Sequence, residues 1–354
     1  MKSIQFLGTL LLSIFFLVAC GNETSENTPT TKFETDSISL AKKAAEMKEI
    51  SSRALLDRIA DYQLLFSAEE NKAFNIYIIN GDGTGLRQLT DDKGSDMLPK
   101  WLPDASGFIF ESDRNQKQFQ AYLFSFSDSL YQKVGNLNFE VRSPSISIDN
   151  DIVFVSEKDK AKHIYKMDLN GKNIQKLTNT TYDDIYPVWS PDALSITFQT
   201  FRHDKQTDIY LCDRSGSNLI RVTKSNAFDY MPNWSPNGKE LIYSSNGSSK
   251  SNNFDIFTIK ANDTSTPKNI SNTPDKNEMM PVFSADGEYI AYMLARGNKT
   301  GIHVMSVDGS THAQVTPDYL AAAMPSWRPP TDIEKALEEQ KPSSSQKVEI
   351  QIGN

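Results

Sequence analysis

A motif of proline, any residue and an aromatic residue recurs along this chain and constrains its fold more than any other feature. Successive prolines are 45, 43, 45, 49 and 44 residues apart, and in the second copy an isoleucine takes the aromatic place. Self-similarity at a period of about 40–50 residues indicates a repeat architecture. The six copies are Pro99–Trp101, Pro144–Ile146, Pro187–Trp189, Pro232–Trp234, Pro281–Phe283 and Pro325–Trp327.

Each copy continues through the same order of elements. Turn residues such as Asn237-Gly238 follow the aromatic position, and Asn-Gly and Asp-Gly close tight hairpins. An apolar strand comes next, and then a strand with an aliphatic-aromatic pair such as Ile209-Tyr210. Four short strands per repeat are typical of a propeller blade. The second strand of each blade is expected at 64–67, 108–112, 152–156, 196–200, 241–245 and 290–294, which predicts an all-β, six-bladed β-propeller over residues 60–330.

The phase of the repeat predicts how the ring closes. The chain enters the propeller at a second strand, 64–67, and its last recognisable piece is a first strand, Pro325–Arg328. A blade alone leaves apolar faces exposed, so the ring must be complete to bury them. We therefore expect the C-terminal strand to complete the first blade.

The first twenty residues carry a targeting pattern. Lys2 precedes an apolar run, Ile4–Val18, and Leu17-Val18-Ala19 leads into Cys20, as in the lipobox of bacterial lipoproteins. The alternative, a transmembrane anchor, is disfavoured because about fifteen apolar residues fall short of the ~20 that span a bilayer. Residues 1–20 are predicted to be a lipoprotein signal peptide with Cys20 as the lipidation site. The lipid anchor would place the protein in the bacterial cell envelope, at the outer membrane facing the periplasm or the cell surface.

Three segments flank the propeller. Residues 21–36 are polar and are predicted to be a flexible tether. Residues 37–59 carry one apolar stripe at helical spacing and are predicted to form a helix that lies across the edge of the propeller. Residues 331–354 are predicted to be a C-terminal tail.

The best-preserved copies, Asp184–Asp192 and Asp229–Gly238, read Asp-x-x-Pro-x-Trp-Ser-Pro-Asp/Asn. This pattern resembles the TolB-like, WD40-like propeller repeat, and the resemblance covers residues 60–330. It implies the propeller fold and, by analogy, a place in the periplasm. TolB itself is a soluble protein with an α/β domain ahead of the propeller. Only about forty residues separate Cys20 from the first blade, so we expect a TolB-like propeller on a lipoprotein rather than TolB proper.

The sequence offers little for catalysis. It contains no Gly-x-Ser-x-Gly elbow. Its four histidines, His163, His203, His303 and His312, share no repeat position, so a metal cluster is not expected. We predict neither enzymatic activity nor a cofactor. The alternative is a carbohydrate-active or lyase-type enzyme with its site at the channel mouth.

Charged residues recur at two positions of the repeat. Three residues before the repeat proline stand Asp96, Val141, Asp184, Asp229, Glu278 and Ala322, and just after three of the second strands stand Arg114, Arg202 and Arg296. Both positions lie on the same face of a four-stranded blade. The four acids and three arginines are therefore the candidate binding residues of the channel mouth. A ring of structural ion pairs is the favoured alternative, because partly exposed pairs are common and individually weak.

Overall charge narrows the partners. The net charge is −8 and the sequence pI about 5.2, and no Lys/Arg run offers a surface for phosphates, so nucleic acid is not expected. We expect a monomeric scaffold that binds an envelope protein or a peptidoglycan-associated partner through one propeller face and touches the membrane only through its lipid anchor.

Overall fold

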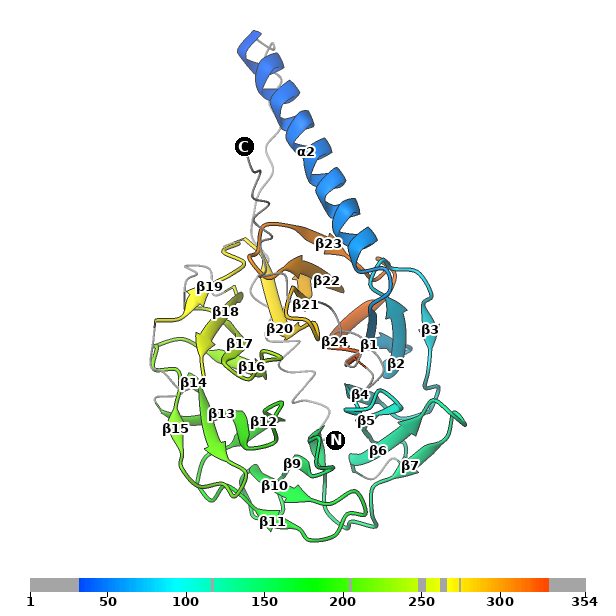
Figure 1. Cartoon of the computed structure of the whole chain (residues 1–354), viewed down its shortest axis with the longest axis vertical. Coiled ribbons are helices and arrows are strands. Elements are labelled where there is room, and N and C mark those ends of the chain that lie inside the picture. The colour runs from blue at the N-terminus through cyan, green and yellow to red at the C-terminus, as the bar shows by residue number, and fades with distance from the viewer. Residues whose placement is uncertain are drawn as a thin grey trace, which may run out of the picture.

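The computed structural model describes residues 32–330, apart from 116–117, 204–205, 248–252, 262–265 and 274. Its strands form six four-stranded sheets arranged in a ring around a common axis (Figure 1). The prediction of an all-β, six-bladed β-propeller is confirmed. The predicted signal peptide, most of the predicted tether and the predicted C-terminal tail lie outside the described residues.

Each blade is an antiparallel sheet whose first strand lies nearest this axis and contributes residues to the lining of a central channel. Blade 1 contains β24 (Ala321–Trp327), β1 (Gln63–Glu70), β2 (Ala73–Asn80) and β3 (Arg87–Gln88). Blade 2 contains β4 (Asp96–Trp101), β5 (Gly107–Ser112), β6 (Gln120–Ser125) and β7 (Tyr131–Lys133). Blade 3 contains β8 (Arg142–Ile146), β9 (Ile152–Ser156), β10 (His163–Met167) and β11 (Gln175–Lys176).

The second half of the ring repeats this arrangement. Blade 4 contains β12 (Asp184–Trp189), β13 (Ser195–His203), β14 (Gln206–Asp213) and β15 (Ile220–Arg221). Blade 5 contains β16 (Asp229–Trp234), β17 (Glu240–Ser245), β18 (Asp255–Lys260) and β19 (Lys268–Asn269). Blade 6 contains β20 (Asn277–Phe283), β21 (Tyr289–Arg296), β22 (Lys299–Ser306) and β23 (His312–Gln314).

The core lies between neighbouring blades. Every residue of β5 and β9 is buried, as expected for strands that are covered on both faces. The repeat tryptophans belong to these interfaces. The indole Nε1 of Trp101 donates to the carbonyl oxygen of Ser326 at 3.1 Å, which joins blade 2 to blade 1, and Trp234 makes the matching bond to Val188 at 3.2 Å. Trp101 and Trp234 thus each link their blade to the preceding one.

The ring is closed within blade 1. β24 pairs with β1 in antiparallel register, with Leu64 opposite Trp327 and Ala68 opposite Ala322. The beginning and the end of the propeller therefore share one sheet, which confirms the predicted closure by the C-terminal strand.

One helix precedes the propeller, α2 (Lys32–Arg58), and it begins five residues before the predicted 37–59 segment. No glycine or proline interrupts residues 32–58, and Ala, Lys and Glu favour a helix there. Leu55 and the following Ile59 are buried, and the Ser52 hydroxyl donates to the carbonyl oxygen of His312 at 2.6 Å.

The helix does not lie across the propeller edge, so that expectation was wrong. Its N-terminal part projects from the ring (Figure 1), and Met47 and Ile50 are 64% and 69% exposed. Leu56 and Ile59 pack beside blades 1 and 6, whereas residues 41–51 are all exposed. In the part of the chain that the structure describes, no helix is long and apolar enough to cross a membrane.

Candidate functional site

The predicted site residues lie near one face of the ring, called here the loop face. This face is formed by the loops that enter the innermost strands and by the connections between second and third strands. Asp96 lies opposite Ser112, Asp184 opposite Thr200, and Asp229 opposite Ser245 in the strand register. Each of these aspartates begins the first strand of its blade and lies opposite a residue near the end of the second strand. The arginine position comes two residues after that opposite residue.

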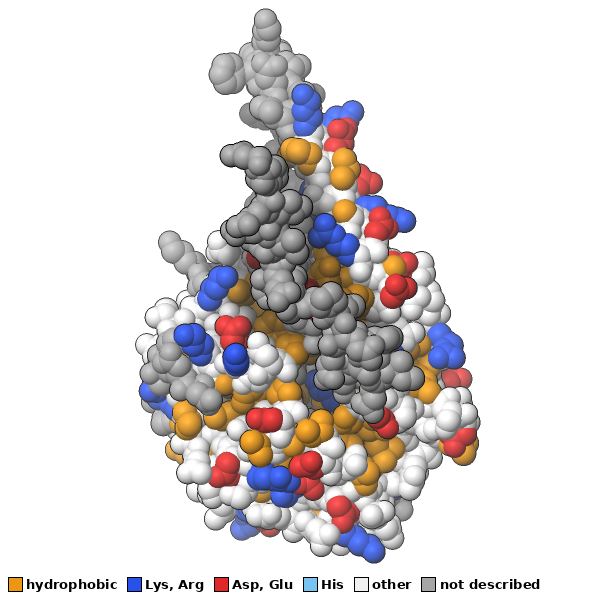
Figure 2. Space-filling model, viewed as in Figure 1, with side chains coloured by type: hydrophobic (Ala, Val, Ile, Leu, Met, Phe, Trp, Pro, Cys, Tyr) orange, Lys and Arg blue, Asp and Glu red, His pale blue; other side chains and the backbone are white. Residues whose placement is uncertain are grey.

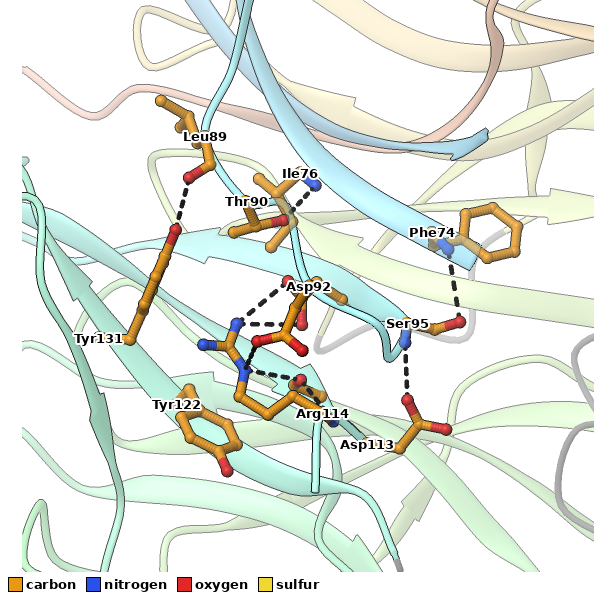
Figure 3. Close-up of polar contacts among 12 residues, drawn as sticks. Phe74, Ile76, Leu89, Thr90, Asp92, Ser95, Asp113, Arg114, Tyr122 and Tyr131 are labelled. Atoms are coloured by element: carbon orange, nitrogen blue, oxygen red, sulfur yellow. Dashed lines mark hydrogen bonds and ion pairs between the residues drawn. The ribbon is translucent and has the colours of Figure 1, made fainter. Parts of the chain in front are cut away.

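In blade 2 the acid and the arginine meet. The Nη2 atom of Arg114 lies 3.1 and 3.0 Å from the two carboxylate oxygens of Asp96, whose side chain is fully buried. The guanidinium also lies 4.7 Å from the ring centre of Tyr122, 4.4 Å from that of Tyr131 and 3.9 Å from Asp92 (Figure 3). Burial raises the pKa of Asp96 and Arg114 lowers it, with burial the larger effect.

Blade 4 repeats the pair. The Nη2 atom of Arg202 lies 2.9 Å from Oδ2 of Asp184, whose side chain is again fully buried. The guanidinium lies over the ring of Tyr210 at 5.1 Å. Thr180 donates a long hydrogen bond of 3.5 Å to the same carboxylate oxygen. Both pairs have the geometry of structural ion pairs held on aromatic rings.

Blade 5 has the acid without an arginine. Gly247 occupies the position that arginine takes in blades 2 and 4. Asp229 accepts a hydrogen bond from the Ser225 hydroxyl at 3.2 Å. Burial raises its pKa to about 6, against smaller opposing effects of the Ser245 and Thr223 hydroxyls. At this position of the repeat a buried carboxyl can exist without a cation.

Blade 6 has both residues but does not bring them together. Glu278 is fully buried, and burial raises its pKa while the Ser271 and Thr273 hydroxyls lower it. Arg296 is exposed at the last position of β21, beside the Gly297 turn, and forms no ion pair with any described residue. The four candidate acids therefore lie beneath the surface of the mouth, and a direct role in binding stays a prediction.

Blade 3 contains a charge pair that the repeat pattern did not reveal. Val141 takes the place of the acid, and the next residue, Arg142, places Nη2 2.9 Å from Oε1 of buried Glu111 in blade 2. The backbone N–H of Ser143 donates to the other oxygen of Glu111 at 2.6 Å, and Arg142 lies 3.8 Å from the ring centre of Phe119. The clue in the sequence was the change from Asp-x to Val-Arg in this copy.

A second feature of the mouth concerns the residue before each repeat proline. The strand register shifts at this point in all six innermost strands, which is the mark of a β-bulge. The residue has a positive φ of 48–61° in every blade although none is glycine. Bulges re-aim side chains, and here they line the channel. The residues are Leu98, Ser143, Tyr186, Met231, Met280 and Met324.

These side chains surround a hollow that is partly open to solvent. Buried Phe119 and Phe254 and half-buried Phe74, Phe201 and Phe228 pack against the same cluster. Hydrophobic side chains gather around the centre of the ring face drawn in Figure 2. The repeat pattern predicted a charged mouth, and the apolar one was not predicted. The missed signal was a large apolar residue before five of the six repeat prolines.

The histidines are dispersed. His163 lies on β10 in blade 3, His203 ends β13 in blade 4, and His303 and His312 lie on β22 and β23 in blade 6. Among the described residues, no group of three or more His, Cys, Asp or Glu side chains could hold a metal ion. The hydroxyl of Tyr292 and Nδ1 of His312 are 3.0 Å apart, which is a contact within one blade.

Together these features define a closed six-bladed β-propeller with buried acids and an apolar channel mouth. The TolB β-propeller domain family matches residues 60–202 and 184–333, so the chain belongs to this family, as the repeat predicted.

Solved structures agree on the fold. TolB from Acinetobacter baumannii is 20% identical, with 86% of this chain and 74% of that chain covered at a TM-score of 0.68. A putative TolB from Agrobacterium tumefaciens is 17% identical, with 76% and 98% covered at 0.59. An oligogalacturonate lyase from Vibrio parahaemolyticus is 14% identical, with 72% and 74% covered at 0.52. At these identities the likeness is one of fold.

Proposed function

We propose that the protein is a non-catalytic scaffold of the bacterial cell envelope that binds a partner protein through the loop face of its propeller. One observation carries this proposal: bulged innermost strands turn Leu98, Tyr186, Met231, Met280 and Met324 into the channel mouth. Methionine side chains adapt to irregular apolar surfaces, and an apolar hollow is the usual form of a binding site. A peptidoglycan-associated protein or another envelope protein fits this surface better than a sugar chain, which needs more polar groups.

The charged residues have a supporting role in this proposal. Asp96 and Asp184 neutralise arginines that lie on aromatic rings, so they fix the loops that surround the mouth. The acids are buried, and they would influence a partner through loop position and through the field of the mouth. The net charge of −8 favours a partner with basic groups at the rim of the contact.

We also propose that Cys20 carries a lipid anchor, as the Leu17–Cys20 pattern suggests. A Cys20→Ala variant should leave the membrane fraction or stay unprocessed, with an intact-mass change that corresponds to the missing lipid. Unchanged fractionation and unchanged mass would contradict the anchor.

The binding proposal is tested by site-specific photo-crosslinking in the native envelope. A photoreactive phenylalanine at Tyr186 probes the mouth, and the same group at exposed Leu194, in the turn between β12 and β13, is the matched control away from the loop face. We expect one protein to crosslink at Tyr186 and not at Leu194, and the purified partner to bind the purified chain. Failure to crosslink at the mouth, or turnover of an oligosaccharide together with a stoichiometric metal ion, would contradict the scaffold role.

A further inference from the structure

Two polar side chains line the channel, each at the residue that directly follows a repeat proline. Lys100 on β4 and Asn233 on β16 each follow the repeat proline and line the hollow. Blades 2 and 5 are three positions apart in a ring of six, so β4 and β16 stand on opposite sides of the channel (Figure 1). The same position holds Val188 in blade 4 and Val282 in blade 6.

Neither polar side chain has a partner in the described part of the chain. Among the described residues, no hydrogen bond or ion pair involves the amine of Lys100 or the side-chain amide of Asn233. By contrast, Arg114, Arg142 and Arg202 all face buried carboxylates. Lys100 is the one charged residue among the described residues that line the hollow.

The surroundings of Lys100 favour an incoming anion. Its amine shares the channel with methionine, leucine, proline and valine side chains, and burial lowers the pKa of Lys100 to about 8. An amine with this pKa is still mostly protonated at pH 7, so the channel contains an uncompensated positive charge. Buried charges are costly unless they are paired.

We propose that the channel binds the C-terminal carboxylate of a partner protein whose last residues are apolar, with Lys100 and Asn233 donating to its oxygens. A monoanion matches the single cation, whereas a phosphate dianion would leave excess charge among apolar walls. The inference rests on the proposed protein-binding role and names the group that is recognised.

The geometry favours a chain end over an internal segment. From the loop face, a ligand first meets the apolar ring at Leu98, Tyr186, Met231, Met280 and Met324. Lys100 lies two residues further along β4 than Leu98, which is at most about 7 Å deeper at strand rise. That depth suits two apolar residues followed by a carboxylate. An internal acidic residue would require the chain to turn back inside the channel.

Isothermal titration of the full chain in lipid nanodiscs tests this with three peptides. The first is N-acetyl-Ala-Leu-Leu with a free carboxylate, the second is its C-terminal amide, and the third is N-acetyl-Leu-Glu-Leu-amide. We expect the free carboxylate to bind roughly tenfold or more tightly than the amide, as for a hydrogen bond to a charged group. Equal affinities for acid and amide, or no binding of any peptide, would overturn the proposal. Tighter binding of the glutamate peptide would overturn the assignment to a chain end.

Variants then assign the preference to Lys100. Lys100→Met should abolish the preference for acid over amide, and Lys100→Gln should do the same if the methionine variant unfolds. Asn233→Val, which copies blades 4 and 6, should weaken acid binding a few-fold. Lys239→Met, at an exposed turn lysine, is the matched control and should change nothing. A preference retained in both Lys100 variants would overturn the proposal, while crosslinking at Tyr186 would still support protein binding.

Discussion

Blades 4 and 5 are neighbours with the same buried carboxyl and different ways of accommodating it. Asp184 in blade 4 faces Arg202 at 2.9 Å, whereas Asp229 in blade 5 has hydroxyl groups and no arginine. Both side chains are almost completely buried. The same position of the repeat therefore buries an aspartate in both blades, with an arginine as its partner in one and hydroxyl groups in the other.

The largest effect should come from opening the ring. The buried carboxyls of blades 4 and 5 can be compared only while all six blades pack together. Truncation before Pro325 removes the last three residues of β24, Pro325–Trp327, and leaves Leu64 and Leu65 of β1 without their partners, which opens a sheet edge and invites aggregation. We expect insoluble or molten protein, judged by size-exclusion chromatography and near-UV circular dichroism. Truncation after Pro330 keeps β24 and is the control. Two equally soluble and equally stable proteins would refute the closure model.

Breaking the pair in blade 4 should have the next largest effect. Arg202→Met leaves buried Asp184 without its cation, and an orphaned buried charge costs about 3 kcal/mol or more. Urea unfolding at pH 7.5 measures the free energy of unfolding. A loss below 1 kcal/mol would mean that Asp184 is as well accommodated by hydroxyl groups as Asp229.

The pH dependence of stability sharpens the comparison. The folded state raises the pKa of Asp229 from 3.8 to about 6, so this group stabilises the fold fully below pH 3.8. That stabilisation is lost as the pH rises through 6, by about 2–3 kcal/mol for a shift of this size. Asp229→Asn should remove the loss and be more stable than wild type at pH 8.

Asp184→Asn is the matched variant for this experiment. It orphans Arg202 and should be less stable than wild type at pH 8, so the two substitutions should have opposite signs in thermal unfolding. Partner capture by the two variants tests the acidic mouth as well. If capture survives in both, these carboxylates serve structure; if it fails while the propeller stays folded, they contribute to binding.

The smallest effect is expected in blade 6. Arg296 is exposed and unpaired among the described residues, so Arg296→Met should change the free energy of unfolding by no more than about 0.5 kcal/mol. Urea unfolding alongside Arg202→Met gives the direct contrast between the two positions. A loss comparable to that of the blade 4 variant would show that Arg296 reaches Glu278 in solution.

Much of the architecture could be predicted from the sequence because a repeat reports its period and phase directly. The spacing of the prolines indicated six blades, and the unmatched strand at Pro325 indicated the closure within blade 1. Repeat phase also placed Asp96 and Arg114 on one face. Periodicity gives the position of a residue along its strand, and in this propeller that information was enough to predict the number of blades and how the ring closes.

The rest depended on features that periodicity does not report. Whether Arg296 meets Glu278 is decided by the conformation at the end of β21, and the bulge before each proline turns Met231 and Met280 into the channel. The projection of α2 depends on which residues of its apolar stripe are buried in the folded protein. Leu55 is buried, whereas Met47 is exposed. These outcomes arise from tertiary packing.

The closure of blade 1 also determines how the molecule responds to force. A pull on α2 is transmitted to β1, which lies between β24 and β2 and is hydrogen-bonded to both. The load therefore acts along two antiparallel ladders in shear, so that many hydrogen bonds must break together before the strand slides out. Unfolding under tension is governed by the rate of that rupture. In a propeller tethered by its N-terminal end, the load would thus act on β1, the strand that is hydrogen-bonded to the C-terminal strand β24.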